Sequence, residues 1–190
     1  MSPAPDPEQK TEPKGKSKSR KSGAPRQSAA RLAAVQALYQ IELSGDSADE
    51  VVLQFLENRR EGEIDAPEGD SAVPPKTELM TEIVRGVHGR LAELDDMLGS
   101  ALSDDWSVAR IEHVLRCIMR AGVYELTARA NVPARVVINE YVELAQAFYG
   151  GSEPGMVNGV LDKLARGLRP NEFGGGAAGT VADDRPPAAK

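Results

Sequence analysis

Two histidines, one cysteine and a few aspartate pairs are the side chains of this 190-residue sequence that could carry catalysis or bind a metal. His88 and His113 lack the HExxH spacing of a zinc site, and Cys117 lies beside the apolar face of an expected helix. The aspartate pairs flank a loop between expected helices, where capping or hydration explains them. Gly150-Gly151-Ser152 lacks the lysine of a phosphate-binding loop. The sequence therefore predicts a protein that is not an enzyme and has no catalytic residues, metal site or cofactor.

Charge is divided unevenly along the chain. The first 31 residues carry eight basic and three acidic side chains, whereas residues 32–173 carry 13 basic and 24 acidic ones. The eight basic residues are Lys10, Lys14, Lys16, Lys18, Arg20, Lys21, Arg26 and Arg31. A basic segment on an acidic body is typical of nucleic-acid binding, because lysine and arginine displace counterions from phosphates. A solvated leader with no such partner is the alternative.

A second group of basic residues lies at 106–135, which carries a local charge of +3 within the acidic body. Arg116 and Arg120 are four residues apart, so they share one face of an expected helix and are candidates for contact with a phosphate backbone. An ordinary solvent face with surface ion pairs is the alternative. Tyr39 lies beside an apolar stripe, where it either stacks on a base or packs at the edge of the core.

Apolar residues recur at helical spacing through the middle of the chain, and no strand-like alternation is present. The expected helices span 28–43, 47–56, 76–98, 111–126, 137–148 and 157–168, with Ser28 as an N-cap and Ser47 with Glu50 as a capping box. We expect an all-α fold of about seven helices in two packed lobes. Residues 1–27 and 171–190 are too poor in apolar side chains to offset their ordering entropy, so they are expected to be a disordered basic arm and a disordered tail.

The composition also indicates a cellular compartment. No apolar run approaches the roughly 20 residues that span a bilayer, and the first 21 residues contain no stretch typical of a signal peptide. A single cysteine cannot form an internal disulfide, which fits a reducing environment. These features predict a soluble cytoplasmic protein.

Five short blocks carry a resemblance to a known family. They are Ala34–Tyr39 (AVQALY), Val123–Leu126 (VYEL), Val132-Pro133, Val137–Glu140 (VINE) and Val157–Lys163 (VNGVLDK). In this order and spacing they resemble the NusB family of transcription antitermination proteins. The resemblance covers residues 28–170 and implies that they form a NusB-like RNA-binding domain with an all-α fold of two helical lobes.

The resemblance also implies a function and its partners. Proteins of the NusB family bind boxA RNA of ribosomal RNA leaders as a heterodimer with the ribosomal protein NusE. The complex joins the antitermination machinery of RNA polymerase and helps the polymerase read through terminators. When free, the protein is expected to be a monomer or a homodimer.

The expected interface residues follow from the charge pattern and from the resemblance. The expected RNA-binding residues are Lys18, Arg20, Lys21, Arg26, Arg31, Gln36, Tyr39 and Arg116. Only Arg31 keeps the charge of the family's arginine-rich helix start, so the basic character has moved upstream into the arm. The expected partner-binding residues are Phe148, Ser152 and Met156, where Ser152 replaces an acidic residue of the family and Met156 an aromatic one.

Two other functions fit parts of these observations. One is a detached copy of the helical domain that precedes ribosomal RNA cytosine methyltransferases, although a chain that ends at Lys190 leaves no room for their cofactor-binding domain. The other is a protein–protein scaffold with a disordered basic leader. Salt-dependent RNA binding separates an antitermination factor from such a scaffold.

Overall fold

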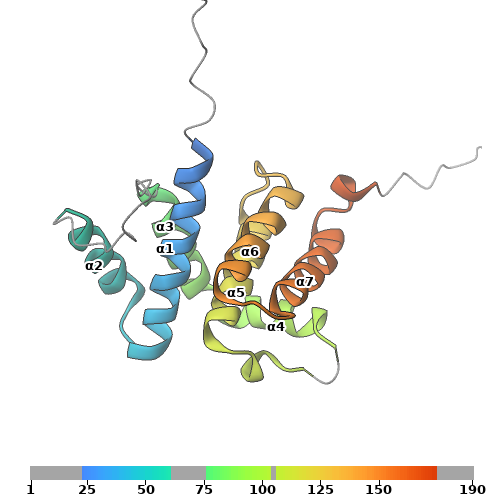
Figure 1. Cartoon of the computed structure of the whole chain (residues 1–190), viewed down its shortest axis with the longest axis horizontal. Helices are drawn as coiled ribbons and strands as arrows, with labels where there is room; N and C mark the ends of the chain where they lie inside the picture. The colour runs from blue at the N-terminus through green and yellow to red at the C-terminus, as the bar shows by residue number, and fades with distance from the viewer. Residues whose placement is uncertain (1–22, 61–75, 104–105, 175–190) are drawn as a thin grey trace, which may run out of the picture.

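The computed structural model describes residues 23–60, 76–103 and 106–174, and this part of the chain folds entirely as helices and their connections (Figure 1). The α-helices are α1 (Gly23–Ser44), α2 (Ala48–Arg60), α3 (Thr77–Gly89), α4 (Leu91–Ala101), α5 (His113–Ala128), α6 (Ala134–Phe148) and α7 (Glu153–Leu168). Two short 3₁₀ helices, η1 (Val108–Arg110) and η2 (Pro170–Phe173), precede α5 and follow α7. The all-α prediction is therefore confirmed.

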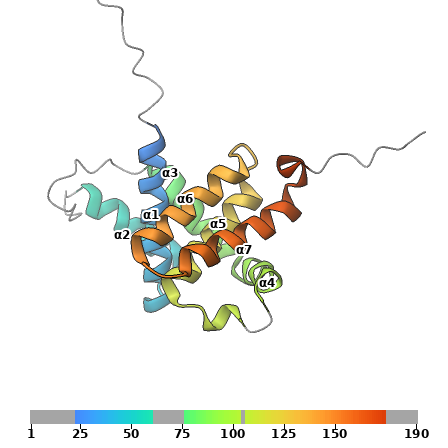
Figure 2. The ribbon, with the colours of Figure 1, turned by 45° about the vertical axis from the view of Figure 1, so that its right-hand side comes forward.

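The helices form two lobes that share α5. Helices α1, α2 and α3 pack together on one side, while α6 and α7 lie side by side on the other and α4 packs against α7 and α5 (Figure 2). Helix α5 contacts α1, α3, α4, α6 and α7, and its residues from Leu115 to Leu126 are buried except at Arg120. The core is built mainly of leucine, valine, isoleucine and alanine from all seven of these α-helices.

Two glycines set the distance of α5 from its neighbours. A Cβ atom added at Gly86 of α3 would lie 2.1 Å from the Tyr124 ring, and one added at Gly122 would lie 2.8 Å from a Leu161 methyl group. No side chain fits at either position without movement of the packed neighbour. The missing side chains therefore let α3 and α7 approach α5 from opposite lobes.

Two helix boundaries differ from the expectation. Helix α1 begins at Gly23, so Ser28 lies inside the helix and is not its N-cap. The Ser28 hydroxyl is within hydrogen-bond distance of the Ala24 carbonyl (3.2 Å) and of the Glu140 carboxylate (2.7 Å), and it shares its one proton between these acceptors. The single helix expected over 76–98 is divided between Gly89 and Leu91. The backbone at Arg90 leaves the helical region (φ −127°, ψ 23°), and its carbonyl accepts the first hydrogen bond of α4.

The predicted capping box at the start of α2 is present. The Ser47 hydroxyl accepts from the backbone N–H of Glu50, and the Glu50 carboxylate accepts from the backbone N–H and the hydroxyl of Ser47. These hydrogen bonds to Ser47 lower the pKa of Glu50. The turn that reverses the chain between α1 and α2 is thereby fixed by two local side chains.

Candidate nucleic-acid interface

The expected RNA-binding residues that the structure describes lie on α1 and, for Arg116, on α5. Lys18, Arg20 and Lys21 lie outside the described residues. Arg26 lies near the start of α1 with an exposed side chain, and its backbone carbonyl accepts a hydrogen bond from the backbone N–H of Lys76 (3.0 Å). This bond joins the start of α1 to the start of α3.

Arg31 is buried, which corrects the expectation that it contacts RNA. Its Nε and Nη2 atoms donate to the two carboxylate oxygens of Glu125 (2.8 and 2.9 Å), and Nη1 lies 3.1 Å from the Glu140 carboxylate. The Tyr141 hydroxyl donates to the same Glu125 carboxylate (2.9 Å). The side chains of Arg31 and Glu125 are 1% and 0% exposed. Arg31 therefore joins α1 to α5 and α6 inside the core and presents no charge to a phosphate.

Burial shapes the ionisation of this cluster. Burial, reinforced by the Glu125 charge, raises the pKa of Tyr141 well above its ordinary value. The phenol therefore stays protonated and donates to Glu125 throughout the physiological range. A buried carboxylate that receives three donors from Arg31 and Tyr141 has the hydrogen bonds that a buried charge requires.

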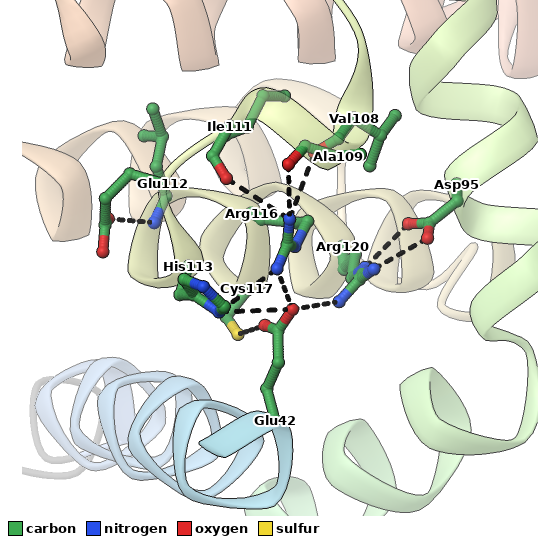
Figure 3. Close-up of polar contacts among 11 residues, drawn as sticks. Glu42, Asp95, Val108, Ala109, Ile111, Glu112, His113, Arg116, Cys117 and Arg120 are labelled. Carbon is green, nitrogen blue, oxygen red and sulfur yellow. Dashed lines mark hydrogen bonds and ion pairs between the residues drawn. The ribbon is translucent and has the colours of Figure 1, made fainter.

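Arg116 is also held by protein groups and not by solvent (Figure 3). One terminal nitrogen pairs with the Glu42 carboxylate at the end of α1, and the other donates to the backbone carbonyls of Val108, Ala109 and Ile111 (3.3–3.4 Å). Its side chain is 10% exposed. This corrects the expectation that Arg116 contacts RNA, since the guanidinium instead fixes the turn before α5 against α1.

Glu42 is the centre of this polar cluster, and no pattern in the sequence singles it out. Its carboxylate pairs with Arg116 and lies 3.5 Å from Arg120 Nη1 and from His113 Nδ1 (Figure 3). It also accepts from the Cys117 thiol (3.3 Å). These partners lie more than 70 positions along the chain, so no local pattern connects them with Glu42.

The environment of Cys117 explains why its thiol is unreactive at neutral pH. Burial raises the pKa of the thiol to about 12, and the neighbouring Glu42 carboxylate adds to this effect. Only the thiolate is a good nucleophile, so a thiol with this pKa is unreactive at neutral pH. No group of three or more histidine, cysteine, aspartate or glutamate side chains within the described ranges is arranged to hold a metal ion.

Three of the five arginines in 106–135 are neutralised by carboxylates. Besides Arg116, Arg120 forms two 2.7 Å hydrogen bonds with Asp95, and Arg129 forms one of 2.7 Å with Glu82. The local charge of +3 is thus largely cancelled by acidic side chains that α1, α3 and α4 bring to α5. The alternative of an ion-paired face accounts for this region better than a phosphate-binding face.

Gln36 and Tyr39 remain on the accessible part of α1. Gln36 is exposed, and Tyr39 is half-buried and packs partly against the core. They are three residues apart, so their side chains are neighbours on the helix surface. A base could meet the outer part of the Tyr39 ring while its inner part stays packed.

We expect Tyr39→Ala to reduce RNA affinity by about 1–3 kcal/mol, the range for an aromatic ring that stacks on a base. Because stacking is not ionic, the loss should persist at high salt, as measured by fluorescence anisotropy of a labelled single-stranded RNA. Tyr39→Phe keeps the ring and serves as the matched control, with near-normal affinity. If Tyr39→Ala lowers the melting temperature and leaves RNA affinity intact, Tyr39 is only a core-edge residue.

The expected partner-binding residues lie around the turn between α6 and α7. Phe148, in the last turn of α6, is 45% exposed, and Ser152 is exposed at the N-cap of α7. Met156 is half-buried and packs against the core, so only part of its side chain faces outward. The half-buried Tyr149 donates to the Glu112 carboxylate and ties this turn to the start of α5. The structure thus groups the three residues at one end of the α6–α7 pair.

The length and apolar character of each described helix show whether it could span a membrane. Among the helices built from 23–60, 76–103 and 106–174, none has the length and apolar character needed to cross a bilayer.

Comparisons of the sequence with a family model and with known proteins give the same family. The model of the NusB family matches residues 28–166. The transcription antitermination protein NusB of Rhodospirillum rubrum is 51% identical, with 80% of this chain and 89% of that protein covered. A protein of the same name from Rhodopseudomonas palustris strain BisB18 is 44% identical, with 88% and 94% covered.

Solved structures agree with the fold. The chain superposes on NusB of T. maritima with a TM-score of 0.60 and 29% identity, covering 77% of this chain and 95% of that one. It also matches a chain in a crystal structure of the antitermination factors NusB and NusE in complex with double-stranded RNA, with a TM-score of 0.58 and 26% identity, covering 74% and 96%.

Proposed function

Because this chain belongs to the NusB family, we propose that it is an RNA-binding transcription antitermination factor. The observation that carries the proposal is the 51% identity to a NusB protein over most of both chains. The alignments cover 89% and 94% of two relatives that are themselves named antitermination proteins, which favours this function over that of a methyltransferase domain. The family is one of antitermination proteins and not of enzymes.

The proposed RNA is the boxA element of ribosomal RNA leaders, and the proposed partner is the ribosomal protein NusE. A related chain has been crystallised with NusE and double-stranded RNA, which supports NusE and an RNA as partners. The complex would act in the cytoplasm on RNA polymerase and help it to pass terminators. We propose that the free protein is a monomer or a homodimer.

The proposed RNA contacts lie in two places. Residues 1–27 carry seven basic and three acidic side chains, and Lys18, Arg20, Lys21 and Arg26 of this segment would contact phosphates. Gln36 and Tyr39 on α1 would contact a base. Arg31 and Arg116 are left out of this set because both are held by carboxylates.

A transcription assay tests the proposed function. Purified RNA polymerase transcribes a template with a boxA leader upstream of a terminator, in the presence of the other antitermination factors and NusE, with and without this protein. We expect readthrough to rise when the protein is added and to stay at background when the boxA sequence is scrambled. Equal readthrough in all samples would contradict the proposal.

A charge on the α6–α7 turn should disrupt the proposed complex with NusE. We expect Phe148→Glu to weaken heterodimer formation by about 2 kcal/mol or more, roughly thirtyfold, as for a central aromatic contact of an interface. Isothermal titration calorimetry with NusE measures the affinity, and circular dichroism checks the fold.

Val136→Glu is the matched control for Phe148→Glu, because Val136 lies on the same helix and is also 45% exposed. Met156→Glu is a weaker choice because Met156 packs partly in the core. An unchanged NusE affinity in folded Phe148→Glu would move the interface away from this turn.

A further inference from the structure

A hollow of about 290 Å³ lies where the ends of α1 and α3 meet the start of α4 and the middle of α5. We call it the Asp46 hollow, after the aspartate that lines it in the turn between α1 and α2. Pockets for drug-sized ligands begin at about 300 Å³, so this hollow has room for a single side chain. Residues 1–22, 61–75 and 104–105, which lie outside the described ranges, join the other ends of α1, α3 and α4, so none of them adjoins the hollow along the chain.

Most of the surface that lines the Asp46 hollow is apolar. Leu38, Val87 and Cys117 are buried, and the Cys117 thiol stays protonated at neutral pH because burial raises its pKa to about 12. Ile41 and Leu91 are half-buried and pack against the core from α1 and α4. A lining of this kind binds the aliphatic part of a long side chain, because contact removes apolar surface from water.

Two of the charged groups that line the hollow already have partners. Glu42 is held by Arg116 and lies 3.5 Å from Arg120 (Figure 3). Arg120 in turn forms two hydrogen bonds of 2.7 Å with Asp95. These two carboxylates and two guanidinium groups balance one another, so they leave no net charge for a ligand.

Asp46 supplies the charge that is left over. Its side chain is half-buried, and in the described part of the chain its carboxylate has no ion pair and accepts no hydrogen bond. Only its backbone N–H is bonded, to the Ser44 hydroxyl (3.1 Å). His88, which also lines the hollow, is neutral in the formal charge at pH 7. The exposed Asp49 and Glu50 in the first turn of α2 add further negative charge, which repels the phosphates of RNA and attracts a cation.

We propose that the Asp46 hollow is a docking site for an arginine side chain of a protein partner. The aliphatic stem of that arginine lies against Leu38, Ile41 and Leu91, and its guanidinium pairs with the Asp46 carboxylate. Arginine fits both halves of the hollow, because its stem is apolar and its planar head matches a carboxylate. It is also one of the residues that carry most of the binding energy at protein interfaces. The hollow shares no residue with the proposed RNA and NusE contacts, so it is a separate protein-binding surface.

A small peptide tests the proposal without knowledge of the partner. The probe is a blocked tripeptide with arginine between two leucines, titrated into isotope-labelled full-length protein and followed by two-dimensional NMR. We expect saturable shifts of the backbone amide signals of Gly45, Asp46 and His88, and none at the α6–α7 turn. A peptide with citrulline, which has the shape of arginine without its charge, should bind about tenfold more weakly, as for the loss of a hydrogen bond between charged groups.

Three variants assign the effect to Asp46. Asp46→Asn should weaken binding of the arginine peptide by about tenfold and leave the citrulline peptide unaffected, because the ion pair is then already absent. Asp46→Glu keeps the charge and should keep most of the affinity. Asp49→Asn is the matched control, since it removes the same charge three residues away. Asp49 is exposed, is paired with Arg85 and does not line the hollow, so this change should leave the affinity unaltered.

Several results would overturn the proposal. The unaltered chain might fail to bind the peptide, Asp46→Asn might bind it as tightly as the unaltered chain, or the shifts might lie elsewhere on the fold. Stronger shifts of the same amide signals by uridine monophosphate would assign the hollow to RNA instead. The peptide titration contains neither boxA RNA nor NusE, so its failure is distinct from a failure of the proposed function. Circular dichroism should show every variant folded, because the Asp46 and Asp49 side chains make no buried contact that the fold requires.

Discussion

Replacement of Glu125 by alanine is expected to lower the free energy of unfolding by about 3–5 kcal/mol, the usual cost of removing one partner of a buried ion pair. The change leaves the Arg31 guanidinium 1% exposed, with the more distant Glu140 as its remaining carboxylate. It also removes the acceptor of the buried Tyr141 hydroxyl. Urea unfolding followed by circular dichroism measures the loss.

Two controls define the cause of this loss. Asp162→Ala breaks the exposed pair with Arg166 on α7 and should cost no more than about 1 kcal/mol. Combining Arg31→Met with Glu125→Gln removes both charges while keeping an acceptor for Tyr141, and should recover much of the stability. A loss below about 1 kcal/mol for Glu125→Ala would indicate that Arg31 reaches solvent, and would return it to the candidate RNA contacts.

Neutralisation of the basic arm is expected to have the largest effect on RNA binding. The substituted residues are Lys14, Lys16, Lys18, Arg20, Lys21 and Arg26, each changed to glutamine. Removal of one cation that binds a phosphate flattens the salt slope by about 0.7, so loss of the four proposed contacts at Lys18, Arg20, Lys21 and Arg26 should change the slope by about 3. Affinity for single-stranded RNA at several salt concentrations measures this change, and the melting temperature should stay constant.

A matched control for the arm uses exposed cations that are already paired with carboxylates. Arg85→Gln and Arg166→Gln remove exposed charges that already face Asp49 and Asp162. They should leave the salt slope unchanged. An arm variant with the slope and affinity of the unaltered chain would show that the arm does not contact RNA and would favour the scaffold alternative.

Features that depend on neighbouring residues could be predicted from the sequence. The apolar spacing predicted the amphipathic helices, because one face of each helix must be buried against another element. The Ser47 and Glu50 capping box was predictable because both of its partners lie within one helical turn. The inert Cys117 was also predictable, since it stands beside an apolar helical face and is 1% exposed.

Features that depend on distant residues could not be predicted in this way. Arg31 lies at the end of the basic segment, but its partner Glu125 lies 94 positions away and holds it in the core. Arg116 is held by Glu42, 74 positions away. A cation that meets a carboxylate across the fold looks the same in sequence as one that faces solvent.

The break between α3 and α4 shows that apolar spacing alone does not predict where one helix ends and the next begins. The apolar residues at 80–98 continue at helical spacing across Gly89 and Arg90, so the pattern predicts one helix. In the structure Leu94 and Leu98 are still buried, but on a separate helix that packs against α5 and α7. Arg90 stabilises this change of direction through Glu93 (2.6 and 2.8 Å) and Thr127 (3.1 Å).

The most direct test of the central claim is the affinity of this protein for a boxA-type RNA, measured by fluorescence anisotropy with and without NusE. The control RNA has the same composition in scrambled order. We predict weak, salt-dependent binding by the protein alone, and tighter binding with a preference for the boxA-type sequence when NusE is present. Equal affinity for both RNAs in the presence of NusE, or no binding to either, would contradict the claim that the chain is a boxA-binding antitermination factor.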